Sequence, residues 1–306
     1  MKRLSLAPFC LFAGLSFATA TFAQERDVTP NQARANFGRT IVLDADDVRA
    51  FAAPPSTFRD ERSDGKVGRI ETLTYESGVT GTQRKATVYL PAGYSPERKY
   101  PVLYLLHGIG GDENEWTNSA SAPRVLDNVL AEGKAVPMIV VMPNGRALAD
   151  DRSPAPDKVF TPENASGFAK FERDLMDFLI PAVQSKYSTQ TDRRNRALAG
   201  LSMGGGQTLN FGFAHLSSFA WLGGFSSAPN TKPPAELLPD PATMRRSGTF
   251  VYLSCGNKDG LINVSQNVHR HLKANGVPHV WNVDGYGHDG DSWAENLHHF
   301  AQRIFR

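Results

Sequence analysis

The pentapeptide Gly200-Leu201-Ser202-Met203-Gly204 constrains this chain more than any other segment. It lies between a short apolar run at residues 197–199 and a stretch that can begin a helix, residues 205–215. In that setting it predicts a tight strand-to-helix turn that lifts the serine hydroxyl clear of the backbone. Such a turn crowds the positions two residues away on either side, where Gly200 and Gly204 carry no side chain. The alternative is a glycine-rich turn that contains a serine by chance, because the chain has 27 glycines.

The first 23 residues have the composition of a secretory signal. Lys2 and Arg3 precede an apolar stretch over residues 4–17, and residues 21–23 offer a cleavage site before Gln24. The stretch is too short to span a bilayer comfortably, so we expect a secreted or periplasmic protein, with a retained anchor as the alternative. Cleavage removes two of the 33 basic residues and none of the 31 acidic ones. The resulting neutral chain disfavours nucleic acid or an anionic membrane as partner.

Three regions are predicted along the chain: the signal (1–23), a polar leader (24–66) and a single catalytic domain (67–306). Pro30, Pro54 and Pro55 interrupt the leader, which shows little periodicity and is expected to be partly irregular. Cys255 would be the only cysteine left after cleavage. Because no internal disulfide can then form, the domain must rely on a large apolar core.

From residue 67 onward, patterns typical of strands alternate with patterns typical of helices. Strands are predicted at residues 67–76, 84–90, 101–106, 137–142, 196–199, 219–225, 249–254 and 279–283. Helices are predicted between the third and fourth strands, from Phe168 to Val183, after Ser202, and at residues 261–275 and 291–304. We therefore expect an α/β fold with a mostly parallel central sheet of about eight strands and helices on both faces. Residues 144–163 are expected to form a surface insertion near a strand end.

A serine hydroxyl needs a base and an orienting acid before it can act as a nucleophile. Asp259 follows the strand 249–254 and is the predicted acid. The alternative for Asp259 is an ordinary turn aspartate before Gly260, and Asp284 is then the fallback acid. His288 lies in a glycine-flanked loop after the last predicted strand and is the predicted base.

Other histidines occur in pairs on predicted helices, without further ligands at metal-binding spacing. We therefore predict no metal site and no cofactor. The oxyanion that forms on attack also needs donors. The backbone N–H groups of Met203 and of Ile109, in the loop 107–111 after an early strand, are the candidates. The alternative for that loop is a plain glycine turn.

Five segments carry a family resemblance. They are LLHGIGGDENEW (105–116), GLSMGGG (200–206), SSAPN (226–230), CGNKD (255–259) and GHDGDSW (287–293). Together they resemble the putative-esterase branch of the α/β-hydrolases. Within that branch the chain looks most like feruloyl esterases of carbohydrate esterase family 1, including the esterase domain attached to some bacterial xylanases. The likeness runs from about residue 67 to the C-terminus and is poor in the leader and at 144–163.

The resemblance implies an α/β-hydrolase fold with Ser202 as nucleophile, Asp259 as acid and His288 as base. It also implies Ile109 and Met203 as oxyanion donors. The implied reaction is hydrolysis of feruloyl or related hydroxycinnamoyl esters on arabinoxylan, a plant cell-wall polysaccharide, or of small aromatic esters. An acyl-enzyme would form on Ser202.

Two other functions remain open at this stage. One is an acetylxylan or general short-chain esterase, and the other is a non-catalytic carbohydrate-binding protein on the same scaffold. Trp116 and Trp293 are predicted to help shape an aromatic-acid pocket, with a role in the core as the alternative for each. The sequence does not specify the oligomeric state.

Overall fold

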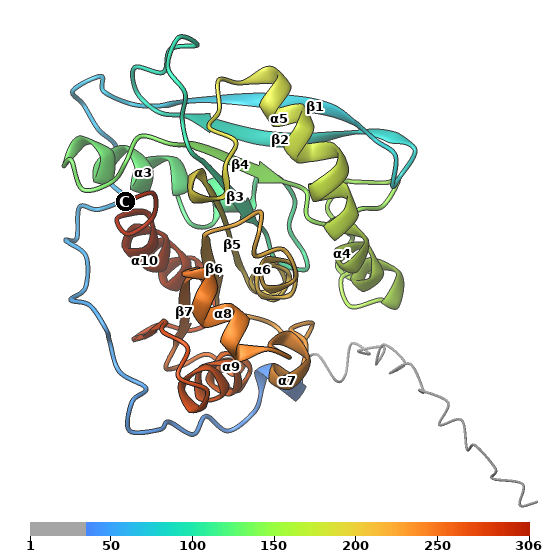
Figure 1. Ribbon diagram of the computed structural model, residues 1–306, viewed down its shortest axis with the longest axis vertical. Helices are drawn as coiled ribbons and strands as arrows, with labels where there is room; N and C mark the ends of the chain where they lie inside the picture. Colours follow the sequence, from blue (N-terminus) through green and yellow to red (C-terminus); the bar gives the residue numbers. More distant parts are fainter. Residues whose placement is uncertain (1–34) are drawn as a thin grey trace, which may run out of the picture.

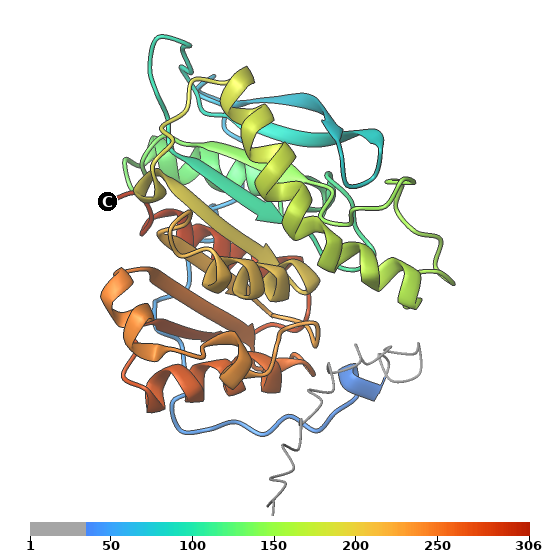
Figure 2. The ribbon, with the colours of Figure 1, turned by 45° about the vertical axis from the view of Figure 1, so that its right-hand side comes forward.

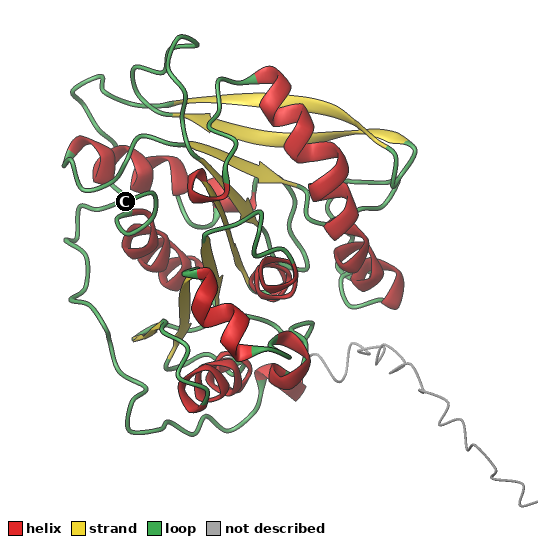
Figure 3. Ribbon diagram, viewed as in Figure 1, coloured by secondary structure: helices red, strands yellow, loops and turns green. Residues whose placement is uncertain are grey.

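Eight strands in the described part of the chain form one sheet (Figures 1 and 3). The structure is a computed structural model that describes residues 35–306, so the predicted signal, residues 1–23, lies outside the described residues. The strands are β1 (Arg69–Ser77), β2 (Thr82–Leu90), β3 (Val102–Leu106), β4 (Ile139–Pro143), β5 (Arg196–Leu201), β6 (Trp221–Phe225), β7 (Phe250–Gly256) and β8 (Val280–Asp284). Their order is β1-β2-β4-β3-β5-β6-β7-β8, parallel from β4 to β8. The predicted mostly parallel sheet is confirmed.

Helices cover both faces of the sheet (Figure 2). One face carries α2 (Glu115–Asn118), α3 (Ala122–Ala131) and α10 (Gly290–Ala301). The other carries α4 (Pro162–Asp174), η1 (Leu175–Leu179), α5 (Ile180–Lys186), α6 (Met203–Ala214), α7 (Pro234–Leu237), α8 (Pro241–Ser247) and α9 (Ile262–Ala274). The short 3₁₀ turn η2 (Arg193–Asn195) leads into β5. Within residues 35–306, no helix has both the length and the apolar character needed to cross a bilayer.

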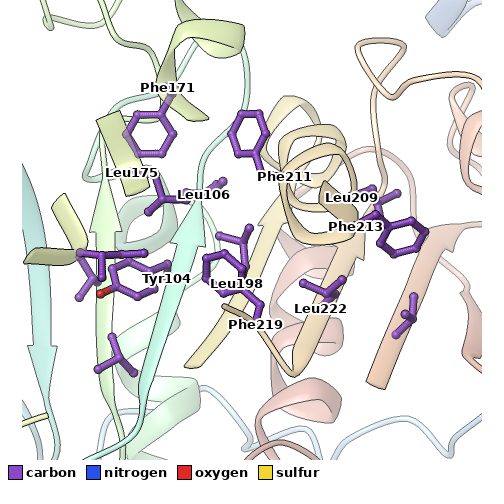
Figure 4. Packing of buried hydrophobic residues seen from close by; sticks show 14 of the residues in the cluster. Tyr104, Leu106, Phe171, Leu175, Leu198, Leu209, Phe211, Phe213, Phe219 and Leu222 are labelled. Atoms are coloured by element: carbon purple, nitrogen blue, oxygen red, sulfur yellow. The ribbon is translucent and has the colours of Figure 1, made fainter. Parts of the chain in front are cut away.

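Side chains of the central strands alternate between two buried apolar layers. Tyr104 and Leu106 of β3 lie in the layer under α4 and α6, whereas Leu103 and Leu105 lie in the layer under α3 and α10. Figure 4 shows the first layer, in which Phe171 of α4 packs above β3. Because successive strand residues point to opposite faces, a strand covered on both sides must be apolar throughout. This explains the uninterrupted apolar runs that the sequence shows at 101–106 and 137–142.

The helix predicted from Phe168 to Val183 is interrupted by one π-helical turn. Residues Leu175–Leu179 form this turn between α4 and α5, immediately before Ile180 and Pro181. Proline lacks an N–H and its ring clashes with the preceding turn of an α-helix, so a local widening lets the chain continue. The periodicity of apolar residues could not reveal this, because the apolar stripe continues through the turn.

Residues 35–62, which we call the strap, run along the surface with little regular structure (Figure 1). Their backbone lies against β8, the last strand of the sheet. Val283 N–H donates to the carbonyl of Val48 (3.1 Å), and Ala50 N–H donates to the Asn282 side chain (2.9 Å). The strap thus covers an edge strand whose backbone groups would otherwise be open to another chain.

A buried ion pair joins the sheet to the helix layer. Arg84 of β2 pairs with Asp174 of α4, and both side chains are fully buried. The same carboxylate accepts from the Tyr75 hydroxyl (2.6 Å). The second Arg84 nitrogen donates to the carbonyls of Asn144 (2.7 Å) and Arg146 (2.8 Å), directly after β4. The charge can be buried at this point because a carboxylate and two carbonyls accept from it.

Removing Asp174 would leave the Arg84 charge buried without its partner. We expect Asp174→Ala to lower the free energy of unfolding by about 3–5 kcal/mol, measured by urea denaturation at neutral pH. Asp150→Ala is the matched control, because it removes the partner of the exposed Arg152 and should leave the unfolding midpoint unchanged. Equal effects of the two substitutions would contradict a structural role for the buried pair.

Candidate active site

Ser202 occupies a strained turn between β5 and α6. Its backbone has φ 52° and ψ −118°, a conformation that non-glycine residues rarely adopt. A Cβ atom at Gly200 would lie 2.4 Å from the carbonyl oxygen of Gly204, and one at Gly204 would lie 2.5 Å from that of Leu106. A side chain at Gly204 would push the turn away from β3, and one at Gly200 would push the start of α6 away from the end of β5. Both glycines flanking the serine are therefore sterically required, as the sequence predicts.

The structure brings Ser202, His288 and Asp259 together at the carboxyl edge of the sheet. His288 Nε2 lies 2.9 Å from Ser202 Oγ, and His288 Nδ1 lies 2.8 Å from Asp259 Oδ2. The three residues follow β5, β8 and β7, respectively. Because these strands are parallel, the loops after them meet at one edge. This hydrogen-bonded chain is the arrangement that activates a serine hydroxyl.

Asp259 is completely buried and satisfied by several donors. Leu261 N–H donates to Oδ1 (2.8 Å), and the Cys255 thiol donates to Oδ2 (3.3 Å), the oxygen that also accepts from His288. Burial alone would raise the pKa of Asp259, but the bonds from His288, Leu261 and Cys255 bring its pKa below the ordinary value. The carboxylate is therefore charged at neutral pH and can stabilise a protonated His288.

Asp284, the fallback acid, occupies a separate hydrogen-bond network. Its Oδ2 accepts from Ser292 Oγ and Asn296 Nδ2, each at 2.7 Å, and its Oδ1 accepts from Tyr286 N–H at 3.0 Å. Burial raises its pKa above the ordinary value. The structure thus places Asp259, not Asp284, beside His288. Asp284 connects the end of β8 to α10.

The two predicted oxyanion donors follow the ends of β5 and β3, as expected. Met203 is the first residue of α6, so its N–H has no acceptor within the helix. Ile109 lies in the glycine-rich loop after β3, where Asn164 Nδ2 donates to its carbonyl (3.1 Å). Glu115 of α2 fixes the start of this loop by accepting from Gly108 N–H (2.6 Å). Sequence reasoning assigned no role to Glu115, although it belongs to the segment that carries the resemblance.

His107 is a buried support for the same loop. Its Nδ1 lies 2.6 Å from the Gly108 carbonyl, and its Nε2 accepts from Gly145 N–H (2.8 Å). That pair of contacts assigns the neutral tautomer with the proton on Nδ1. Burial lowers the pKa of His107, in agreement with a neutral ring. The oxyanion loop is thereby tied to the segment that follows β4.

Neither predicted tryptophan presents an exposed ring to a ligand. Trp116 is 1% exposed, packs against Phe225, and donates from Nε1 to the Leu106 carbonyl (2.8 Å). Its position in the core corrects the predicted substrate contact, because a ring closed off on all sides cannot reach a ligand. Trp293 is 8% exposed and packs edge-on against His288, with ring centroids 5.4 Å apart. Trp293 therefore supports the imidazole ring of His288 by packing against it.

A small apolar cluster stands beside the nucleophile instead. Phe168, Met203, Ala228 and Leu261 are buried together, and Ile109 packs against them. The cluster is separate from the two large core layers. Its members come from the middle of α4, the start of α6 and loops far apart in the chain, so no local sequence pattern could have assembled it.

The sequence model of the putative esterase family matches residues 77–300. The chain belongs to this family. It is 34% identical over 83% of its length to an endo-1,4-beta-xylanase/feruloyl esterase of Xylanibacter ruminicola, covering 34% of that protein. It is also 34% identical over 46% of its length to endo-1,4-beta-xylanase Y of Acetivibrio thermocellus, covering 12% of that protein. The chain thus spans about a third of the first relative and about an eighth of the second.

Solved structures agree with the α/β-hydrolase fold. A ferulic acid esterase of family CE1 from Anaeromyces mucronatus, in complex with ferulic acid, superimposes with a TM-score of 0.75 at 29% identity. The match covers 83% of this chain and 96% of that one. An S-formylglutathione hydrolase of Staphylococcus aureus has a TM-score of 0.58 at 18% identity and shares the fold. The predicted family and fold are both confirmed.

The two buried aspartates allow a matched test of the acid. We expect Asp259→Asn to slow labelling of Ser202 by a fluorophosphonate roughly ten-thousandfold, because the amide favours the wrong tautomer of His288. Asp284→Asn should leave the rate within about tenfold of wild type, since Asp284 does not touch His288. The measurement is the labelling rate of folded protein. A larger loss in Asp284→Asn than in Asp259→Asn would show that Asp284, not Asp259, is the acid.

Glu115 gives a second test, aimed at the oxyanion loop. Glu115→Ala removes the acceptor that fixes Gly108 N–H, so the Ile109 N–H loses its alignment. We expect a fall of about tenfold in kcat for 4-nitrophenyl acetate, less than the loss of a whole oxyanion donor. Glu115→Gln keeps an acceptor oxygen and should restore most of the activity. Full activity in the alanine variant would show that the loop holds its shape without Glu115.

Proposed function

We propose that this protein is a serine carboxylic-ester hydrolase that releases hydroxycinnamates, above all ferulate, from arabinoxylan. The observation that carries the proposal is the hydrogen-bonded chain from Ser202 Oγ through His288 to Asp259. Membership of the putative esterase family supports ester hydrolysis. The xylanase/feruloyl esterase relative and the ferulic acid esterase structure support the acyl group and the polysaccharide.

The proposed reaction has two steps. Ser202 Oγ attacks the ester carbonyl carbon while His288 Nε2 accepts the hydroxyl proton. The N–H groups of Ile109 and Met203 then hold the oxyanion. When the carbon–oxygen bond to the alcohol breaks, His288 returns the proton to that alcohol and an acyl-enzyme remains on Ser202. Water attacks the acyl-enzyme by the reverse proton route and releases the free acid.

The apolar cluster beside Ser202 supports an apolar acyl group. Ile109, the partly exposed residue of this group, packs on a buried cluster that includes Met203, the residue after Ser202, and that contains no charged side chain. Contacts of this kind favour a planar, largely apolar acid such as ferulate. The amino-terminal segment 1–23 supports export, and we propose that the enzyme acts outside the cytoplasm, where polysaccharide is available.

An acetylxylan or short-chain esterase is the second candidate. One observation favours it: Trp116 is closed off in the core and Trp293 lies beneath His288. Neither of the two residues predicted to recognise an aromatic acid therefore presents an exposed ring to one. Acetyl groups need no such recognition.

Three substrates distinguish the candidates. Wild type and Ser202→Ala are assayed with methyl ferulate, 4-nitrophenyl acetate and acetylated xylan. We expect wild type to release ferulate, and Ser202→Ala to lose roughly a thousandfold or more in kcat, because the three site residues act as a unit. Acetate release without ferulate release would favour the second candidate. Binding of xylan without turnover of any ester would indicate a non-catalytic carbohydrate-binding protein.

A further inference from the structure

The strap carries an aromatic residue to the catalytic histidine. The ring of Phe37 packs edge-on against the ring of His288, with centroids 5.2 Å apart. The Phe37 carbonyl oxygen also lies where a Cβ at Gly260 would be only 2.1 Å away. The strap backbone therefore rests directly on the turn that follows Asp259. Nothing in the local sequence around Phe37 links it to a site more than two hundred residues away.

Polar contacts fix the strap next to Phe37. Gln266 Nε2 donates to the Val42 carbonyl (2.9 Å), and Arg270 pairs with Asp44 (2.5 Å). The Trp281 indole N–H donates to Asp47 (2.8 Å). The donors of these bonds belong to α9 and β8, and β8 leads directly into the loop of His288. The position of Phe37 is thus set by the folded domain.

Phe37 also has an exposed ring. Its side chain is among the large apolar ones left open, with 41% of the residue exposed, whereas Trp293 on another side of His288 is buried. His288 must face the oxygen of the leaving alcohol, because it returns the proton to that oxygen. An exposed ring packed on His288 is therefore placed near the leaving alcohol of the ester.

From this placement we propose that Phe37 is a specificity-determining residue that favours esters whose leaving alcohol is a sugar. A sugar ring presents a face of C–H groups, which packs on an aromatic ring through dispersion and burial of apolar surface. A methyl group is too small to cover such a ring. The proposal rests on the proposed ester hydrolysis and adds recognition of the alcohol part of the substrate.

Two esters with the same acid and different alcohols test the proposal. Kinetics are measured with methyl ferulate and with a feruloylated arabinoxylan oligosaccharide, using the full chain. We expect Phe37→Ala to lower kcat/KM for the oligosaccharide about tenfold, equivalent to about 1.4 kcal/mol, chiefly through KM. The value for methyl ferulate should stay within about twofold of wild type, with an unchanged pH profile.

Three variants serve as controls. Phe37→Tyr keeps the ring and should retain the preference for the sugar ester, whereas Phe37→Leu keeps apolar bulk without the flat face and should lose it. Val42→Ala removes another exposed apolar side chain of the strap, 69% exposed, and should behave as wild type with both esters. An equal thermal midpoint of all four variants shows that the fold is intact.

Each result bears on a separate statement. Equal losses on both esters in Phe37→Ala would overturn the proposal, because Phe37 would then only support His288. Unchanged kinetics on both esters would also overturn it. Wild-type activity on methyl ferulate without activity on the oligosaccharide would overturn the sugar preference and leave ester hydrolysis standing. Failure of wild type to release ferulate from either ester would contradict the proposed function itself.

Discussion

The close approach of the Ser202 turn to β3 is the constraint on which the site depends. Gly204 lies so near the Leu106 carbonyl that no Cβ fits between them, and Gly200 lies equally near Gly204. Only this approach lets a residue with positive φ present its hydroxyl at the edge of the sheet while its carbonyl accepts from Gly206 and Ala228. The cost of the strained backbone is met by the packing of β5 between β3 and β6.

The same edge also decides which acid serves the histidine. Asp259 and Asp284 are both buried at the ends of neighbouring strands. Asp259 receives its bonds from the turn that follows β7, and one oxygen stays directed at His288. The bonds of Asp284 are used to join β8 to α10. Each carboxylate oxygen accepts only a few hydrogen bonds. The donors around a buried aspartate therefore decide whether one of its oxygens can still accept from the histidine.

The strap contacts both the edge strand β8 and the loop of His288. The sheet ends in β8, an edge strand, and the backbone around Val48 and Ala50 covers it. The part that precedes this cover reaches the loop of His288 through Phe37. A segment held for structural reasons can thus bring an aromatic side chain to the reacting centre. The apolar side chains left exposed there do not contribute to the core, which agrees with a role at the surface.

Much of the fold could be predicted from the sequence because its signals are local. Apolar runs and the alternation of apolar and polar residues located all eight strands to within a few residues, and glycine spacing indicated the turn at Ser202. The order of Ser202, Asp259 and His288 along the chain was enough to place them on loops at one edge. Parallel strands always deliver such loops to the same side.

Tertiary structure decided what depends on contacts between distant segments. It separated Asp259 from Asp284, closed Trp116 into the core and placed Trp293 beneath His288. It also brought Cys255, Glu115 and Phe37 to the site, for which no spacing rule exists. The sequence by itself determined which residue types could react and on which strand ends they stand. Which side chains surround them followed only from packing, because burial and hydrogen-bond partners are properties of the assembled fold.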